Sequence, residues 1–178
     1  MADMKTRLVA KVVTTVMLAI WAGLAPAHAG SSDFQVLARM LHFIEGVPDG
    51  ERTVGVVIDP AVPGAVTAAE ELKAAFGTGK TFENITLTAK AISPSEIGSV
   101  DIVFVPEGLS KHHAMISAEA QKKGALTITN DPACVESQDC VISVRRRART
   151  EILWSRGAAQ RASVGLGETL KALVEERP

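Results

Sequence analysis

The hydrophobic positions of this chain switch repeatedly between strand-like and helical spacing. Residues 53–59 form a nearly continuous β-branched run, which is typical of a strand buried on both faces of a sheet. Short runs of the same kind follow at 101–105 and 125–130. Around these strands the apolar residues recur at helical spacing, which predicts helices at 34–44, 65–76 and 109–122.

Weaker patterns extend this series. Residues 82–90 alternate between polar and apolar positions, so we expect a strand with one exposed face at one edge of the sheet. Residues 141–146 and 150–154 are expected to pair as an antiparallel hairpin that turns near Arg147 and closes the other edge. The last two segments, 157–162 and 167–176, are predicted to be helical, with Leu166, Leu170 and Leu173 facing the core.

Strands that alternate with helices imply right-handed crossovers and a parallel sheet covered on both faces. The expected fold is therefore α/β, a three-layer sandwich with a mostly parallel central sheet, closed at one side by the antiparallel hairpin. Ser32 or Asp33 is the expected N-cap of the first helix and Ser110 that of the third, which Gly124 should end. Since no internal repeat or linker is visible, residues 30–178 are expected to form a single domain.

The first 29 residues have the features of a cleavable signal peptide. A basic region precedes an apolar run at 12–24, and an Ala-His-Ala motif at 27–29 provides a small-x-small cleavage site. The basic region contains Lys5, Arg7 and Lys11. We expect cleavage after Ala29 and a periplasmic mature protein; an uncleaved anchor is the alternative, although the apolar run is short for a membrane span.

Composition and cysteine content narrow the function classes. The chain is 47% hydrophobic with a formal net charge of −1, which gives no reason to expect nucleic-acid binding. Cys134 and Cys140 are its two cysteines. In an exported protein an even pair is more often a disulfide than a metal or redox site, and this one would stabilise the fold by roughly 2–3 kcal/mol. Two unpaired buried thiols are the alternative.

Residues 110–113, Ser-Lys-His-His, are the strongest local candidate for catalysis or metal binding because they follow a predicted strand. Adjacent residues on a helix point about 100° apart, so His112 and His113 are poorly placed to bind one metal ion. We expect His113 to pack partly buried between Leu109 and Ile116. The sequence therefore predicts no catalytic residue, metal or cofactor, and no enzymatic activity.

Polar residues follow each of the predicted parallel strands. Asp59, Glu107 and Asn130 come just after three of them, at the carboxyl edge where open α/β sheets bind ligands. These three residues are the candidate site for a small ligand. Asp131 lies nearby, but we favour a turn-initiating role for it before Pro132.

Four arginines, Arg145, Arg146, Arg147 and Arg149, form the strongest charge cluster, at the expected hairpin turn. Guanidinium groups bind carboxylates and phosphates bidentately, so the cluster is a candidate contact with an acidic protein surface or with phospholipid head groups. The equally weighted alternative is a solvated tip that prevents edge-to-edge aggregation.

The C-terminal third resembles the tail of the YfiR-like family, small exported proteins named after a periplasmic repressor of an inner-membrane diguanylate cyclase. The family's strand, loop, hairpin, small-residue helix and leucine-containing helix correspond to residues 126–130, 131–140, 141–154, 157–162 and 166–174. Its early helix and two of its strands correspond to 34–45, 54–58 and 101–106. The chain departs from the family pattern at 138–140, where a glycine-rich turn is common, and at Trp154-Ser155, where an Ile-Asn-like pair is common.

The resemblance implies a periplasmic regulator that binds other proteins, with the disulfide supporting its inhibitory form. Our leading expectation is a non-enzymatic exported protein that binds the periplasmic part of an inner-membrane signalling protein, with a diguanylate cyclase as the implied partner. Formation of a homodimer is left open. The alternative is a periplasmic small-ligand-binding protein that uses Asp59, Glu107 and Asn130 at the carboxyl edge of the sheet.

Overall fold

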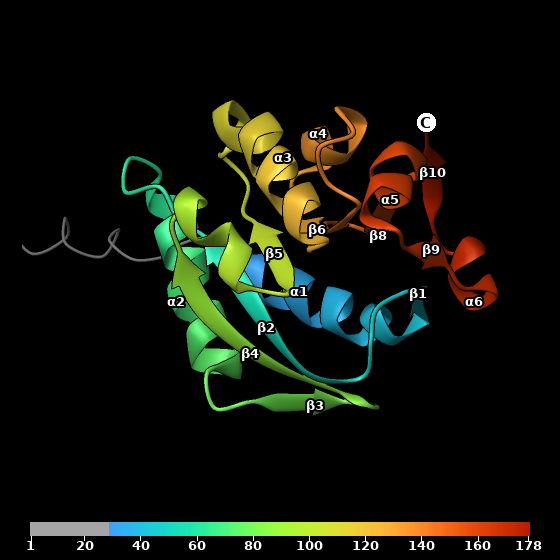
Figure 1. Ribbon diagram of the computed structural model, residues 1–178, viewed down its shortest axis with the longest axis horizontal. Coiled ribbons are helices and arrows are strands. Elements are labelled where there is room, and N and C mark those ends of the chain that lie inside the picture. Colours follow the sequence, from blue (N-terminus) through green and yellow to red (C-terminus); the bar gives the residue numbers. More distant parts are fainter. Residues whose placement is uncertain (1–28) are drawn as a thin grey trace, which may run out of the picture.

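The protein is a three-layer α/β sandwich in which helices cover both faces of a twisted sheet (Figure 1). The computed structural model describes residues 29–178, with side chains from Asp33 onward. The predicted signal peptide, residues 1–29, therefore lies outside the described residues except for Ala29. Within the described part, no helix has both the length and the apolar character needed to cross a membrane.

In the part of the chain that the structure describes, the central sheet has eight strands and is mostly parallel. Its strands are β2 (Gly50–Val57), β3 (Lys80–Phe82), β4 (Ile85–Ile92), β5 (Ile102–Val105), β6 (Leu126–Thr129), β7 (Ile142–Arg146), β8 (Thr150–Ser155) and β10 (Glu175–Arg177). They are ordered β10-β8-β7-β6-β5-β2-β4-β3, and β2, β4, β5, β6 and β7 all run in one direction. A separate two-stranded sheet pairs β1 (Ile44–Glu45) with β9 (Gly165–Leu166). The predicted fold class is confirmed.

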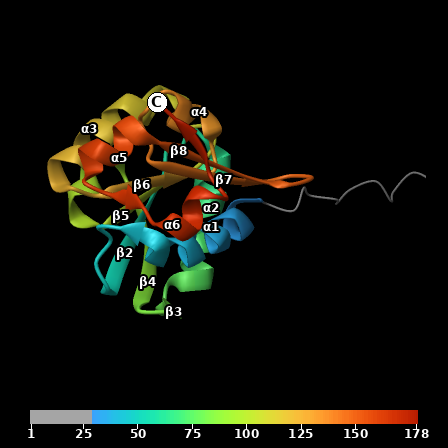
Figure 2. The same cartoon turned by 90° about the vertical axis from the view of Figure 1, so that its right-hand side faces the viewer.

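Within residues 29–178, six α-helices and three short 3-10 helices connect the strands. The α-helices are α1 (Ala29–Met40), α2 (Pro63–Phe76), α3 (His113–Lys123), α4 (Pro132–Glu136), α5 (Arg156–Ala162) and α6 (Glu168–Lys171), and the 3-10 helices are η1 (Leu41–Phe43), η2 (Pro94–Ser99) and η3 (Ser110–His112). In Figure 2, α3 and α4 lie on one side of the sheet and α1 and α2 on the other.

Strand alternation divides the buried side chains into two cores, one on each face of the sheet. The larger core packs α1 and α2 against the sheet around Phe34, whose ring meets Phe76 and Phe104 edge-to-face at centroid distances of 4.9 and 5.4 Å. On the other face α3, α4 and η2 cover side chains such as Val103 and Val105. The two cores hold β2, β5 and β6 at the centre of the molecule.

Two predictions about the edges of the sheet are wrong. The alternating segment at 82–90 is split by a turn at Glu83, where φ is +52°, and β4 lies inside the sheet because β3 pairs with its outer side. The β7–β8 hairpin forms as predicted but does not close the sheet, because β10 pairs with β8. A free strand edge offers unpaired backbone groups, and the C-terminal residues satisfy them.

Several predicted helix limits also change. Residues 167–176 form only the four-residue α6 before β10 begins, so Leu173 is 65% exposed while Leu166 and Leu170 are buried. The first helix starts before Asp33, and η3 moves the N-cap of α3 from Ser110 to His112. Gly124 ends α3 as predicted, in the left-handed conformation with φ of +65°.

The predicted disulfide forms between Cys134 and Cys140, and both cysteines are fully buried in the smaller core. The segment between them is not a loop throughout, since α4 occupies its first part. Asp131 begins this helix by accepting a hydrogen bond from the backbone N–H of Ala133 at 3.1 Å, which confirms its turn-initiating role. The backbone carbonyl of Cys134 accepts from the N–H of Cys140 at 2.9 Å, so the bridge closes a compact unit under β7.

Removing the bridge should destabilise this unit. We expect the double substitution Cys134→Ser and Cys140→Ser to lower the free energy of unfolding by about 2–3 kcal/mol, because the unfolded chain regains the entropy of a short closed loop. Urea denaturation of both proteins measures the difference. Reduction of the unmodified protein with dithiothreitol is the matched control, and equal midpoints before and after reduction would contradict the expectation.

Candidate functional site

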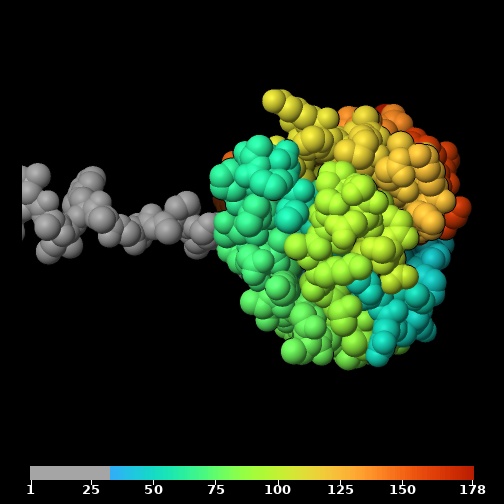
Figure 3. Space-filling view, turned by 60° about the vertical axis from the view of Figure 1, so that its left-hand side comes forward, coloured from blue at the N-terminus to red at the C-terminus, as the bar shows by residue number. Residues whose placement is uncertain are grey.

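The carboxyl edge of the sheet gathers the polar residues that the sequence analysis selected. Because β2, β5, β6 and β7 are parallel, their carboxyl ends lie along one edge. From β2 the chain passes to β4, which lies beside β2 in the sheet, and then crosses back to β5 on the other side of β2. The direction in which strands are added to the sheet therefore reverses between β2 and β5. Ligands of open α/β sheets bind at such a reversal. Figure 3 shows the teal surface of the β2–α2 segment adjoining the lime and gold surface of η2 and α3.

Asp59 and His112 join the two loops that flank this reversal. The Oδ2 atom of Asp59, after β2, lies 3.0 Å from Nε2 of His112, after β5. Its Oδ1 atom accepts a hydrogen bond from the backbone N–H of Ala61 at 2.8 Å. The Ala61 hydrogen bond, followed by that of His112, lowers the pKa of Asp59 below its usual value. Asp59 is therefore an anion that remains partly open to solvent, with its side chain 27% exposed.

The loop after β5 is held close to the loop after β2. Gly108 has a φ of +97°, and a Cβ atom at this position would lie 3.0 Å from Cγ1 of Val62. Glycine tolerates both the left-handed backbone and the close approach. Glu107, which directly precedes Gly108 in this loop, is exposed.

Asn130 has a structural role at this edge. Its Oδ1 atom accepts a hydrogen bond from the backbone N–H of Glu107 at 2.8 Å, and the residue is only 8% exposed. Next to it, the hydroxyl of Thr129 donates to the carbonyl of Val105 at 2.6 Å and accepts from the N–H of Asp131 at 2.9 Å. These bonds tie the end of β6 to the end of β5. Of the three predicted ligand residues, Asp59 and Glu107 face solvent and Asn130 positions the loop.

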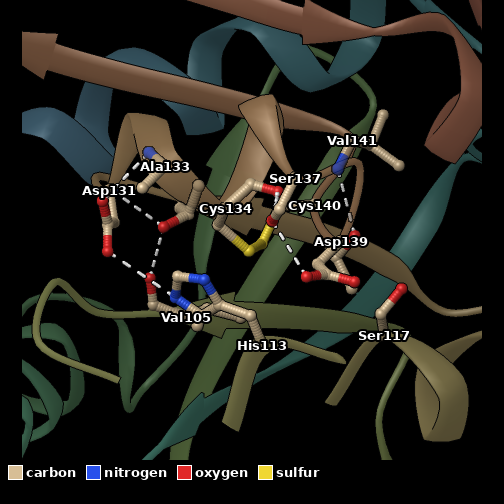
Figure 4. The surroundings of a disulfide bond; sticks show 12 residues. Val105, His113, Ser117, Asp131, Ala133, Cys134, Ser137, Asp139, Cys140 and Val141 are labelled. Carbon is tan, nitrogen blue, oxygen red and sulfur yellow. Dashed lines mark hydrogen bonds and ion pairs between the residues drawn. A yellow bond between two sulfur atoms is a disulfide. The ribbon is translucent and has the colours of Figure 1, made fainter. Parts of the chain in front are cut away.

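His113 is buried and lies beside the disulfide, whose two cysteines belong to the smaller core (Figure 4). It is 5% exposed, as the sequence led us to expect, and its Nε2 atom lies 3.6 Å from Oδ2 of Asp131. Burial lowers the pKa of His113, although the carboxylate of Asp131 opposes this shift. The two adjacent histidines thus contact carboxylates that follow different strands. His112 contacts Asp59 after β2, and His113 contacts Asp131 after β6.

The arginine cluster lies at the same edge but farther along it. Arg146, Arg147 and Arg149 are exposed, and the hairpin tip that carries them extends beyond the body of the sheet (Figure 2). Arg145 is half-buried and pairs with Glu151 on β8 at 3.2 Å. Since β7 lies three strands from β2, roughly 14 Å separates the two strands. The cluster and the acidic pair are therefore two surfaces on one edge.

Asp33 is a buried polar residue that the sequence analysis treated only as a helix cap. It is 1% exposed on α1, and its Oδ1 atom accepts a hydrogen bond from the backbone N–H of Arg146 at 3.1 Å. Burial raises its pKa, while the hydrogen bond and the charge of Arg146 lower it. Asp33 lies four residues before Leu37 on the same face of α1, which was the signal available in the sequence. The contact fixes the base of the hairpin to α1.

The polar side chains at this edge are placed to contact a ligand from solvent. Across residues 29–178 there is no group of three or more His, Cys, Asp or Glu side chains arranged to hold a metal ion. The Asp59–His112 pair and Glu107 offer carboxylate oxygens and one imidazole to a ligand from solvent. Such groups bind hydroxyl and ammonium donors.

The buried histidine should make stability depend on pH. The unfolded chain binds a proton at His113 near its usual pKa of 6.5, whereas the folded chain binds it only at lower pH. Stability should therefore be complete above pH 6.5 and fall as the pH drops through the lowered pKa. We expect His113→Gln to flatten this fall in urea titrations at a series of pH values. His42→Gln, at an exposed histidine, is the control, and an unchanged slope in His113→Gln would contradict the assignment.

Comparisons with known proteins identify the fold. No family model and no curated protein matches the chain. It resembles a conserved domain protein from Vibrio cholerae, with a TM-score of 0.60 and 12% identity over 83% of this chain and 59% of that one. It also resembles a Streptococcus pneumoniae ABC domain in complex with L-Trp, with a TM-score of 0.57 and 14% identity over 83% of this chain and 60% of that one.

A third similar structure is the ligand-free, open form of a substrate-binding protein with adhesive properties from Clostridium difficile. Its TM-score is 0.58, with 10% identity over 82% of this chain and 58% of that one. The chain thus spans between 58% and 60% of the length of these three structures. At such low identities the likeness shows a shared α/β fold.

Proposed function

We propose that this protein is an exported binding protein for a small polar ligand, which it holds at the reversal between β2 and β5. The observation that carries the proposal is the Asp59–His112 pair across that reversal, with Glu107 exposed on the same loop as His112. Asp59 and Glu107 supply the acceptors, so the ligand carries an amine or hydroxyl donor. The disulfide supports export, because such bonds persist in oxidising compartments.

Two of the structurally similar proteins support a binding role. The Streptococcus pneumoniae domain is in complex with L-Trp, and the Clostridium difficile protein is a substrate-binding protein. This chain spans about three-fifths of each of them, and Asp59 at the proposed site is partly open to solvent. We therefore expect dissociation constants of roughly micromolar to millimolar for a ligand bound by this chain alone.

Ligand binding can be tested by thermal shift with a panel of free amino acids, L-tryptophan included. A ligand that binds the folded state raises the melting temperature, and we expect Glu107→Gln to remove most of that rise because one acceptor loses its charge. Glu70→Gln, at an exposed glutamate on α2, is the matched control. A rise that survives in Glu107→Gln and in Asp59→Asn would place the ligand elsewhere.

A second candidate function is protein binding through the arginine cluster. The exposed Arg146, Arg147 and Arg149 on a projecting hairpin suit contact with an acidic surface, because guanidinium groups pair bidentately with carboxylates. The resemblance to the YfiR-like family makes the periplasmic part of an inner-membrane signalling protein, such as a diguanylate cyclase, the partner to test. In this function the Asp33 contact holds the hairpin at a fixed angle to α1.

Crosslinking of the tagged protein in its own cells tests this second function. We expect a membrane signalling protein to be captured, and capture to fall about tenfold when Arg146, Arg147 and Arg149 are replaced by glutamine, since rim charges mainly set the rate of association. Replacement of Arg156 and Arg161, which lie on α5 away from the hairpin, is the control. Equal capture by both variants would exclude the hairpin as the contact.

A further inference from the structure

The amino edge of the sheet, opposite the candidate site, contains a pocket that the sequence analysis did not anticipate. Its volume is about 220 Å³. It is lined by Gly46, Val47, Pro48, Arg52, Val100, Asp101, Ile102, Lys123, Gly124, Ala125, Leu126, Ala162 and Val164. Most of these are aliphatic or small, and the charged side chains among them are two cations and one carboxylate.

Hydrogen bonds to the backbone hold Arg52 in place at this pocket and leave some of its N–H donors free. Its Nε and Nη2 atoms donate to the backbone carbonyls of Pro48 at 3.0 Å and Asp49 at 2.8 Å. Its Nη1 atom lies 3.6 Å from Oδ1 of Asp101, which is too long for a hydrogen bond. A guanidinium group has five N–H donors, so this fixed and half-buried cation can still bind an anion.

Asp101 forms an ion pair with Arg52 and offsets one of the two positive charges at the pocket. Its Oδ2 atom accepts a hydrogen bond from the backbone N–H of Thr53 at 2.7 Å, and its other oxygen faces Arg52. Lys123 brings a second cation from the last turn of α3. The carbonyls at the end of this helix are already occupied, because Ala120 and Gln121 accept hydrogen bonds from Gly124 and Ala125. The charges of Arg52, Lys123 and Asp101 therefore sum to one positive charge, next to an aliphatic pocket lining.

We propose that this pocket binds a small aliphatic monocarboxylate, with Arg52 and Lys123 binding the carboxylate group. The hydrocarbon chain lies against the aliphatic lining formed by residues such as Val47, Val100 and Val164. The volume is below the roughly 300–1,000 Å³ of sites for drug-sized ligands, which selects a short chain. A guanidinium fork favours a planar carboxylate, and the apolar lining favours a ligand with a hydrocarbon tail over an inorganic anion.

The site is separate from the one proposed at the carboxyl edge. Val100, Ala125 and Leu126 lie where β5 and β6 begin, whereas Glu107 and Asn130 lie where these strands end. Gly46 and Gly124 line the pocket, so their amide signals can monitor binding there. Gly108 lies at the carboxyl edge beside Val62, so its amide signal can monitor binding at the other site. The two sites can therefore be observed independently in one experiment.

Titration of the ¹⁵N-labelled protein with sodium hexanoate tests the proposal. We expect saturable shifts of the Gly46 and Gly124 amide signals at millimolar concentrations while Gly108 stays in place. Hexanamide, which has the same chain without the charge, should bind roughly tenfold more weakly. Absence of saturable shifts, equal binding of hexanamide, or shifts at Gly108 alone would each overturn the proposal.

Variants of neighbouring lysines refine the test. Lys123→Met should raise the dissociation constant for hexanoate roughly fivefold, because it removes one partly solvated charge. Lys122→Met is the matched control, since Lys122 pairs with Glu119 at 2.6 Å and does not line the pocket. Arg52→Lys keeps the charge but loses the fork and should also weaken binding. Equal affinities in Lys123→Met and Lys122→Met would contradict the role of Lys123.

Discussion

The parallel pairing of β2, β5, β6 and β7 is the constraint on which both candidate sites depend. In this register the carboxyl ends of β2, β5 and β6 are level and β7 continues beyond them to Arg146, so polar residues that follow β2, β5 and β6 meet at one edge. Hydrogen bonds across the ends of β5 and β6 then fix the loops: Thr129 binds the carbonyl of Val105, and Asn130 binds the N–H of Glu107. Without them the loop that carries Glu107 and His112 would have no fixed position relative to Asp59.

The same register creates two chemically different edges. The carboxyl edge has the Asp59–His112 pair, the exposed Glu107 and, farther along, the arginine hairpin. The amino edge has Arg52 and Lys123 on an aliphatic lining. Because the sheet lies between them, ligands at the two edges make no common contact, and each proposal rests on its own residues.

The disulfide unit links the core to the carboxyl edge. Cys134, Cys140 and His113 lie together under β7, and Asp131 begins α4 while facing His113. A change in the charge of His113 therefore acts on the packing around the bridge as well as on the loop after β6. The hairpin is fixed from the other face, where Asp33 accepts a hydrogen bond from Arg146. Both faces of the sheet thus support the segment that carries the arginines.

The sequence by itself determined the fold class, the central strands, the hairpin, the disulfide and the burial of His113, because these follow from local periodicity and from the chemistry of single residue types. Only the tertiary structure decided the edges of the sheet, since pairing of β3 and β10 depends on which strand edges remain free. It also gave Asn130 a structural role and brought Asp59 to His112 across 53 residues. Contacts between distant residues are set by packing of the whole chain, and local patterns do not encode them.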